Sequence, residues 1–331
     1  MNNVDDGVEI WGGTVNIKYF NIWNIGDDTF DVDQGWRGKA QFGLVVQGYS
    51  TRSAQGSGTG DNIFETDGAE QSDFQPVTTA VIYNVTAIGQ PGTGGTGTDG
   101  SDHATAWRDN ARVQYRNSIF MDIGDRLVSF DNVDGDGGLG YGINSTLSWA
   151  ATWTTAFNAV PAHANDCASP GTVYQAQASG NLAQISDSVF FRNQTASAYT
   201  ESDARAVTTP AGLIANNNVK ATLSPIQLLV RDTAIDYNPG AGNLHQARVI
   251  SLDPRPANDA LTSAGAAPND GFFTPASYRG AFRPSTGGVE ILPWVCGWTA
   301  ADAFGFIKPC KDRSGQATGG SATNPKADIG L

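Results

Sequence analysis

The sequence predicts an all-β protein whose short strands wind forward as a right-handed parallel β-helix, with surface loops inserted between the coils. The first observation is a repeat: residues 4–10, VDDGVEI, return 22 residues later as GDDTFDVD at 26–33. Weaker copies follow at 60–67 and 124–131. The chain also contains 40 Gly but only 2 Met, which is typical of tight turns and short strands. Because so short a unit cannot bury an apolar face alone, its copies must stack around one shared core.

Alternation of apolar and polar residues predicts the individual strands. Strands are predicted at residues 8–10, 15–17, 20–25, 30–32 and 40–46, and again at 183–185, 189–191, 219–230 and 247–252. The basic coil is 22 residues long, and wider spacings coincide with stretches rich in Gly, Ser and Thr, such as 53–60 and 91–100. We interpret these stretches as inserted surface loops. Residues 139–164 are expected to form a loop or short helical excursion from the stack.

The last quarter of the chain differs from the repeats. We place the β-helix at 1–252 and a non-repetitive closing segment, rich in Pro, Gly and aromatic residues, at 253–331. Its large rings are suited to covering an open end of the stack, although an aromatic sugar-binding surface is the functional alternative. Cys296 and Cys310 lie in this segment and form either a disulfide or two small buried thiols. Nothing before Val4 could cover the first coil, so we expect coils and an export signal upstream of Met1.

Composition and motifs exclude several functions. The formal net charge of −13 disfavours nucleic acid and anionic lipid surfaces as partners. No apolar run is long enough to span a membrane. The sequence lacks the C-x-x-C-H motif of covalent haem and a phosphate-binding loop between a strand and a helix, so neither haem nor a nucleotide is expected. His103, His163 and His245 are far apart in sequence, and none has a carboxylate or thiol at recognisable ligand spacing.

Acidic residues recur at one turn of the repeat. Aligned copies place Asp5, Asp27, Asp61 and Asp125 in one column, and Asp6, Asp28, Asn62 and Arg126 in the next. On the following strand, Glu9, Asp31 and Glu65 should point outward together. Stacked carboxylates repel unless they are solvated, protonated or joined by a cation, and such oxygen ligands suit calcium. The candidate calcium ligands are Asp5, Asp27, Asp31, Asp61, Asp134 and Asp136; the alternative is Asp side chains that bond the backbone of their own turns.

Two other groups of residues could bind or act on sugars. Trp11, Trp23 and Trp36 lie close together along the first coils and are candidate stacking platforms for glycan rings; the alternative is that they simply cover strand ends. Paired carboxylates can also cleave glycosidic bonds as an acid and a base. If the protein is an enzyme, the catalytic candidates are Asp5, Asp6, Asp27 and Asp28.

Two resemblances sharpen these expectations. The pattern of Asp5, Asp6, Asp27 and Asp28 resembles the catalytic aspartates of the polygalacturonase family, but the Gly-His-Gly of that family is replaced by Gly48-Tyr49-Ser50 and no Arg-x-Lys follows nearby. The phrases at 5–16, 26–38, 84–89 and 268–299 resemble a large group of bacterial secreted β-helix proteins of uncharacterised function. That resemblance implies a β-helix at the cell surface or outside the cell; it implies no particular activity, and no catalytic residues can be transferred from it.

The sequence therefore favours a non-enzymatic extracellular or cell-surface protein. Its partners would be surface glycans, other surface proteins or copies of itself, with self-association through the open N-terminal coil. The alternatives are a polysaccharide-cleaving enzyme that uses aspartates on adjacent coils, and a subunit of a filament or surface layer.

Overall fold

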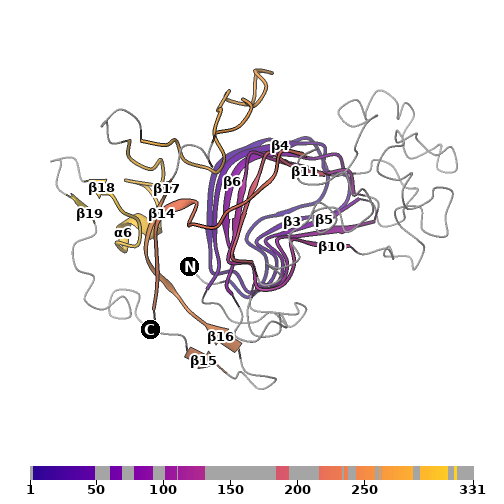
Figure 1. Ribbon diagram of the computed structural model, residues 1–331. Coiled ribbons are helices and arrows are strands. Elements are labelled where there is room, and N and C mark those ends of the chain that lie inside the picture. Colours follow the sequence, from indigo (N-terminus) through magenta and orange to yellow (C-terminus); the bar gives the residue numbers. More distant parts are fainter. Residues whose placement is uncertain are drawn as a thin grey trace, which may run out of the picture.

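The computed structural model describes residues 3–48, 60–68, 78–91, 101–109, 111–130, 184–193, 216–232, 235–237, 244–257, 261, 263–285, 291–311 and 317–318. Two parallel sheets and a C-terminal segment of antiparallel pairs make up the described fold (Figure 1). The expected excursion at 139–164, with Asp134 and Asp136, lies outside the described residues.

The first sheet contains one strand from each successive coil. Its order is β1 (Glu9–Ile10), β3 (Phe30–Val32), β5 (Phe64–Asp67), β7 (Thr105–Arg108) and β10 (Val128–Phe130), and every neighbouring pair is parallel. The register pairs Glu9 with Asp31 and Asp31 with Glu65, so like residues stack as the repeat predicts. The parallel coil is therefore confirmed, whereas its right-handedness stays a prediction.

The second sheet is longer and bent. Its parallel strands are β2 (Ile17–Trp23), β4 (Lys39–Val46), β6 (Val81–Ile88), β8 (Gln114–Arg116), β9 (Ile119–Met121), β11 (Gln184–Ser186), β12 (Val189–Phe191) and β13 (Val219–Lys220). The sheet bends where one residue of each coil has a positive φ. These residues are Tyr19, Phe42, Asn84, Asn117, Asp187 and Asn217. Asn and Asp tolerate this left-handed conformation better than other non-glycine residues, so four of these six positions suit the bend.

Apolar side chains fill the inside of the coil. Phe30 and Phe64 stack across adjacent rungs with ring centroids 5.7 Å apart, and Phe64 also lies 5.1 Å from the ring of Tyr115. These three side chains have no exposed surface. Because strand residues alternate between faces, an inward Phe30 and Phe64 require an outward Asp31 and Glu65. The predicted facing of the first sheet is thus confirmed.

A second core lies outside the coil, on the face of the second sheet. Trp23, Leu44 and Ile88 project from this face and pack against Phe282 and Val295 of the C-terminal segment. The segment comprises β14 (Ile226–Arg231) paired antiparallel with β17 (Val249–Pro256), the pairs β15 (Ile235–Tyr237) with β16 (Leu244–Gln246) and β18 (Cys310–Lys311) with β19 (Ala317–Thr318), and the helix α6 (Ala300–Ala303). It lies beside the stack in Figure 1.

This placement differs from the cap expected over the end of the stack. The physical reason is that the second sheet carries apolar side chains on both faces, so its outer face must also be covered. Among the described residues, the stacked parallel strands of the coil end at β13, before the boundary expected at 252, because β14 and β17 already belong to the covering segment.

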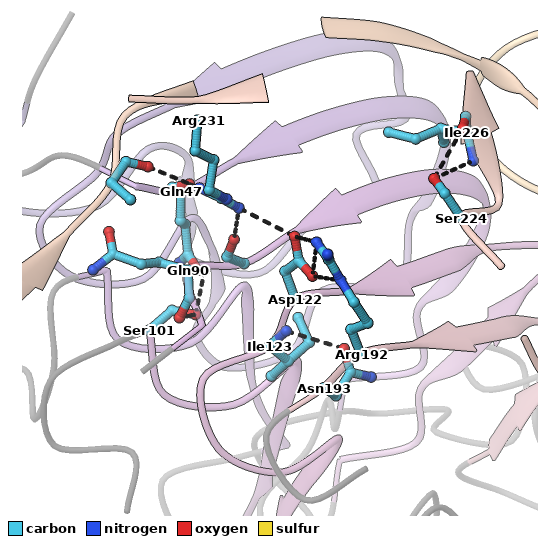
Figure 2. Close-up of polar contacts among 12 residues, drawn as sticks. Gln47, Gln90, Ser101, Asp122, Ile123, Arg192, Asn193, Ser224, Ile226 and Arg231 are labelled. Atoms are coloured by element: carbon cyan, nitrogen blue, oxygen red, sulfur yellow. Dashed lines mark hydrogen bonds and ion pairs between the residues drawn. The ribbon is translucent and has the colours of Figure 1, made fainter. Parts of the chain in front are cut away.

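Two arginines of the covering segment, Arg231 and Arg279, bind the backbone of the stacked coils. Arg231 of β14 donates from Nη1 to the carbonyl oxygen of Gln47 at 3.1 Å, and from Nη2 to that of Gly89 on the next coil (Figure 2). The same guanidinium lies 3.6 Å from the buried carboxylate of Asp122, to which Arg192 donates from Nε and Nη2 at 2.9 Å each (Figure 2). One side chain thus binds equivalent strand ends on three rungs.

Arg279 does the same at the bend of the second sheet. Its Nε donates to the carbonyl oxygen of Asp187, and its Nη2 donates to that of Asn217 at 2.9 Å. The next residue, Gly280, has a φ of +83°, and a Cβ there would come within 2.7 Å of Ile119. The chain therefore needs glycine where it lies flat against the coil. Cys296 and Cys310 form a disulfide within the same segment, which decides between the two alternatives left open by the sequence.

Candidate functional site

The acidic turn predicted from the repeat forms a continuous corner before the first sheet. Backbone pairing fixes its register: the amide of Gly7 donates to Asp28 O, that of Thr29 to Asn62 O and that of Ile63 to His103 O, each at 3.0 Å. The rung of Asp102 and His103 thus lies between those of Asn62 and Arg126. The sequence alignment missed this rung because a loop of different length precedes it.

Two of the candidate catalytic aspartates hold this corner together. Asp6 Oδ1 accepts the backbone amide of Asp28 at 3.1 Å, and Asp28 Oδ1 accepts that of Asn62 at 2.8 Å. Each carboxylate therefore binds the main chain of the following coil. Asp28 is 4% exposed and Asp27 is 7% exposed, whereas Asp5 is exposed. Of the four candidates, the buried pair has little access to a polymer substrate.

Crowding and burial raise the proton affinity of this corner. Burial, more than the neighbouring carboxylates Asp27 and Asp5, raises the pKa of Asp6 to about 7, although the amide of Asp28 opposes the shift. Burial followed by the charge of Glu65 raises the pKa of Asp31 to about 9. Burial and the adjacent Glu65 also raise the pKa of Asp28 well above its usual value. Part of the acidic ladder consequently keeps its protons at neutral pH.

The candidate calcium ligands fall into three overlapping groups of oxygen donors. In each group, one potential ligand atom per residue lies within 4.8 Å of the others; the groups are Asp5, Asp6 and Asp27, then Asp6, Glu9 and Asp31, then Asp27, Asp28 and Asp61. The structure thus brings the four candidate calcium ligands that it describes, Asp5, Asp27, Asp31 and Asp61, into one corner, although no single group contains all four. Their hard oxygen atoms fit the preference of calcium.

His103 is a site residue that the sequence reasoning missed. Its Nε2 lies 3.1 Å from Asp102 Oδ1 and 3.1 Å from Asp125 Oδ2, and its Nδ1 lies 3.0 Å from Asn62 Oδ1. The expectation that His103 has no carboxylate at ligand spacing was wrong, because Asp102 adjoins it in the chain and Asp125 arrives from the next rung. The adjacent pair Asp102-His103 within an acidic column was the signal that could have revealed it.

A cleft of about 420 Å³ opens between the first coils and the covering segment. It is lined by Asn3, Asp6, Gly7, Asn21, Ile22, Trp23, Asn24, Ile25, Trp298, Thr299, Ala300, Ala301, Phe304 and Phe306. Trp298 is 60% exposed, and the rings of Trp23 and Phe306 stack with centroids 6.0 Å apart. Apolar rings and side-chain amides therefore meet in one concave surface.

The three tryptophans proposed as glycan platforms have different environments. Trp36 points into the coil with no exposed surface and donates from Nε1 to Val15 O at 2.9 Å, so the prediction for this residue was wrong. Its ring fills the interior beside Phe30. Trp23 lines the cleft but is mostly buried, and Trp11 is 69% exposed, with its Nε1 bonded to Glu9. The more accessible cleft tryptophan, Trp298, was recognised only as part of the closing segment.

The stacked parallel strands and their acidic corner define a repeat protein of the parallel β-helix class. A family model described as "Pectate-lyase like beta helix domain" matches residues 1–187, more than half of the chain. The chain belongs to this family, which fits a surface protein or a protein that acts on polysaccharides. Neither the curated proteins nor the solved structures contain a match. Within the described ranges, no helix is long and apolar enough to cross a membrane.

Proposed function

We propose that the protein is a non-enzymatic binding protein that holds a neutral glycan in the cleft between its first coils and the covering segment. The observation that supports this most is the exposed indole of Trp298 on the rim of a cleft that also contains Trp23 and Phe306. Aromatic faces stack on sugar rings, and amide groups such as those of Asn21 and Asn24 can bond sugar hydroxyls.

The residues that line the cleft are better suited to binding a glycan than to cleaving it. Hydrolysis by an acid and a base needs two carboxyl groups that flank the same bond. Among the residues that line the cleft, Asp6 is the one acidic side chain, and one of its oxygens already accepts the amide of Asp28. The net charge of −13 and the nearby ladder also repel uronate polymers, which favours a neutral ligand.

The disulfide supports an extracellular or surface location for this binding protein. Structural disulfides persist mainly in oxidising compartments, and the bond between Cys296 and Cys310 joins the segment that forms one wall of the cleft. Surface glycans are therefore the partners we propose. Self-association through the first coil and assembly into a surface layer remain predictions.

Replacing Trp298 by Ala should weaken glycan binding about fivefold, since loss of a stacking platform removes on the order of 1 kcal/mol. Isothermal titration of a panel of neutral oligosaccharides would measure the effect after an array has found a ligand. Trp11→Ala is the matched control, because Trp11 is equally exposed but lies outside the cleft lining.

The same experiment can contradict the proposal. Equal losses of affinity for Trp298→Ala and Trp11→Ala would show that the cleft is not the binding site. Release of reducing ends or unsaturated sugars from any polysaccharide, abolished by Asp6→Asn, would favour the enzyme instead.

We also propose that calcium binds the group formed by Asp6, Glu9 and Asp31. A divalent cation would offset the burial, and the neighbouring negative charges, that together raise the pKa values of Asp6 and Asp31. Millimolar Ca²⁺ should raise the melting temperature at pH 8, and the gain should shrink at pH 5, where protons compete for the same oxygens. Differential scanning calorimetry with and without a chelator measures this, and a melting temperature unmoved by chelator at pH 8 would contradict it.

A further inference from the structure

We propose that Asp102, His103 and Asp125 form a binding site for a divalent transition cation, for which Zn²⁺ is the best-fitting probe. This site shares no residue with the glycan cleft or with the three oxygen-only groups, the nearest of which contains Asp61 on the preceding coil. It would be the one mixed nitrogen and oxygen group found among the described residues.

The fold itself builds the site. The backbone amide of Asp102 donates to Asp61 O at 2.9 Å, and that of Asp125 donates to Asp102 O at 2.8 Å. These hydrogen bonds stack Asp125 directly on Asp102, so carboxylates from consecutive coils face the same ring nitrogen. Asp102 Oδ1 and Asp125 Oδ2 each lie 3.1 Å from His103 Nε2. A small shift of side chains suffices to place an ion between the three donors.

The other nitrogen of the ring is oriented as in metal-binding histidines. His103 Nδ1 lies 3.0 Å from Asn62 Oδ1, so in one tautomer of the ring Nδ1–H donates to that oxygen. In that tautomer Nε2 offers its lone pair between the two carboxylates and can join them on a cation; with no cation bound, Nε2–H can instead donate to Asp125 Oδ2, beside which Arg126 Nε lies at 3.5 Å. A ligand histidine commonly donates its other N–H to such an oxygen, which fixes both tautomer and ring orientation.

The donor set selects the kind of ion. Imidazole nitrogen with two carboxylate oxygens suits Zn²⁺ and similar transition ions, whereas Ca²⁺ prefers oxygen alone. The side chains of Asp102 and His103 are each 14% exposed and that of Asp125 is 20% exposed, so an ion can enter from solvent. Three protein ligands would leave a coordination position for water.

The alternative for the same geometry is a protonated imidazolium paired with the two carboxylates. In that case both ring nitrogens carry protons, and the cluster has no vacant lone pair for a metal. The charge of His103 would then be the stabilising element, and added Zn²⁺ would compete poorly with it.

Isothermal titration of the full chain with Zn²⁺ at pH 7.5 tests the proposal. We expect binding to the wild type, at least tenfold weaker binding for His103→Gln and Asp125→Asn, and an unchanged affinity for Asp5→Asn, which alters the oxygen-only groups instead. Substitution with Co²⁺ provides a second readout, because a nitrogen ligand shifts its visible absorption.

Two outcomes would overturn the inference. One is the absence of Zn²⁺ binding at 100 times the protein concentration; the other is equal affinity in the wild type and His103→Gln. If His103→Gln fails to fold, ¹⁵N-histidine NMR of the wild type decides. A Zn²⁺-dependent shift of the Nε2 resonance of His103, with Nδ1 still protonated, supports the site, whereas two protonated nitrogens unaffected by Zn²⁺ contradict it.

Discussion

Asp31→Asn should stabilise the protein at pH 8 by at least about 2 kcal/mol. Burial and Glu65 raise the pKa of Asp31 to about 9, so the folded state must take up a proton that the unfolded chain releases near pH 4. An asparagine keeps a neutral group of the same shape without that uptake. Chemical denaturation at pH 8 in a buffer containing chelator would measure the gain.

The sign of the wild-type pH dependence follows from the same raised pKa values. Between pH 4 and pH 7 for Asp6, and between pH 4 and pH 9 for Asp31, the folded state binds more protons than the unfolded state. The free energy of unfolding therefore falls as pH rises through this window, by up to about 1.4 kcal/mol per pH unit for each group. The stabilising contribution of these two groups is fully present below about pH 4, where both are protonated in the folded and the unfolded state.

Asp270→Asn is the matched control, because the pKa of Asp270 is lowered by folding whereas that of Asp31 is raised. Desolvation alone would raise the pKa of Asp270, but Lys39 and the backbone amides of Phe273 and Phe272 lower it to about 2. This substitution should therefore destabilise the protein at pH 7, and the loss should disappear toward pH 2. A wild-type stability that rises between pH 5 and pH 8, with no gain from Asp31→Asn, would contradict the protonated ladder.

Phe64→Ala should cost about 3–5 kcal/mol, the largest loss we expect from a single truncation. Phe64 has no exposed surface and its ring packs between those of Phe30 and Tyr115, so the substitution leaves a cavity that bridges adjacent rungs. Urea denaturation would show the loss as a lower midpoint. Trp298→Ala removes a larger but mostly exposed ring and should cost less than about 1 kcal/mol. Similar losses for the two variants would show that the interior stack is not the principal core.

Much of the candidate site could be predicted before any coordinates were known. The outward alignment of Glu9, Asp31 and Glu65 follows from alternation and from the 22-residue repeat. The inward position of Trp36 could not be predicted, because a tryptophan next to a glycine turn suits either face. His103 was also missed, since loops of unequal length hide which residues share a rung.

By itself, the sequence determined that short parallel strands stack and that acidic side chains recur at one corner. Both properties are local and periodic: each coil repeats the same pattern, and the period decides what lies above what. Only the tertiary structure decided that the C-terminal segment covers the side of the second sheet, that Cys296 and Cys310 are bonded, and that a cleft with Trp298 lies beside Asp6. These features join residues far apart in the chain, and no repeat encodes their separation.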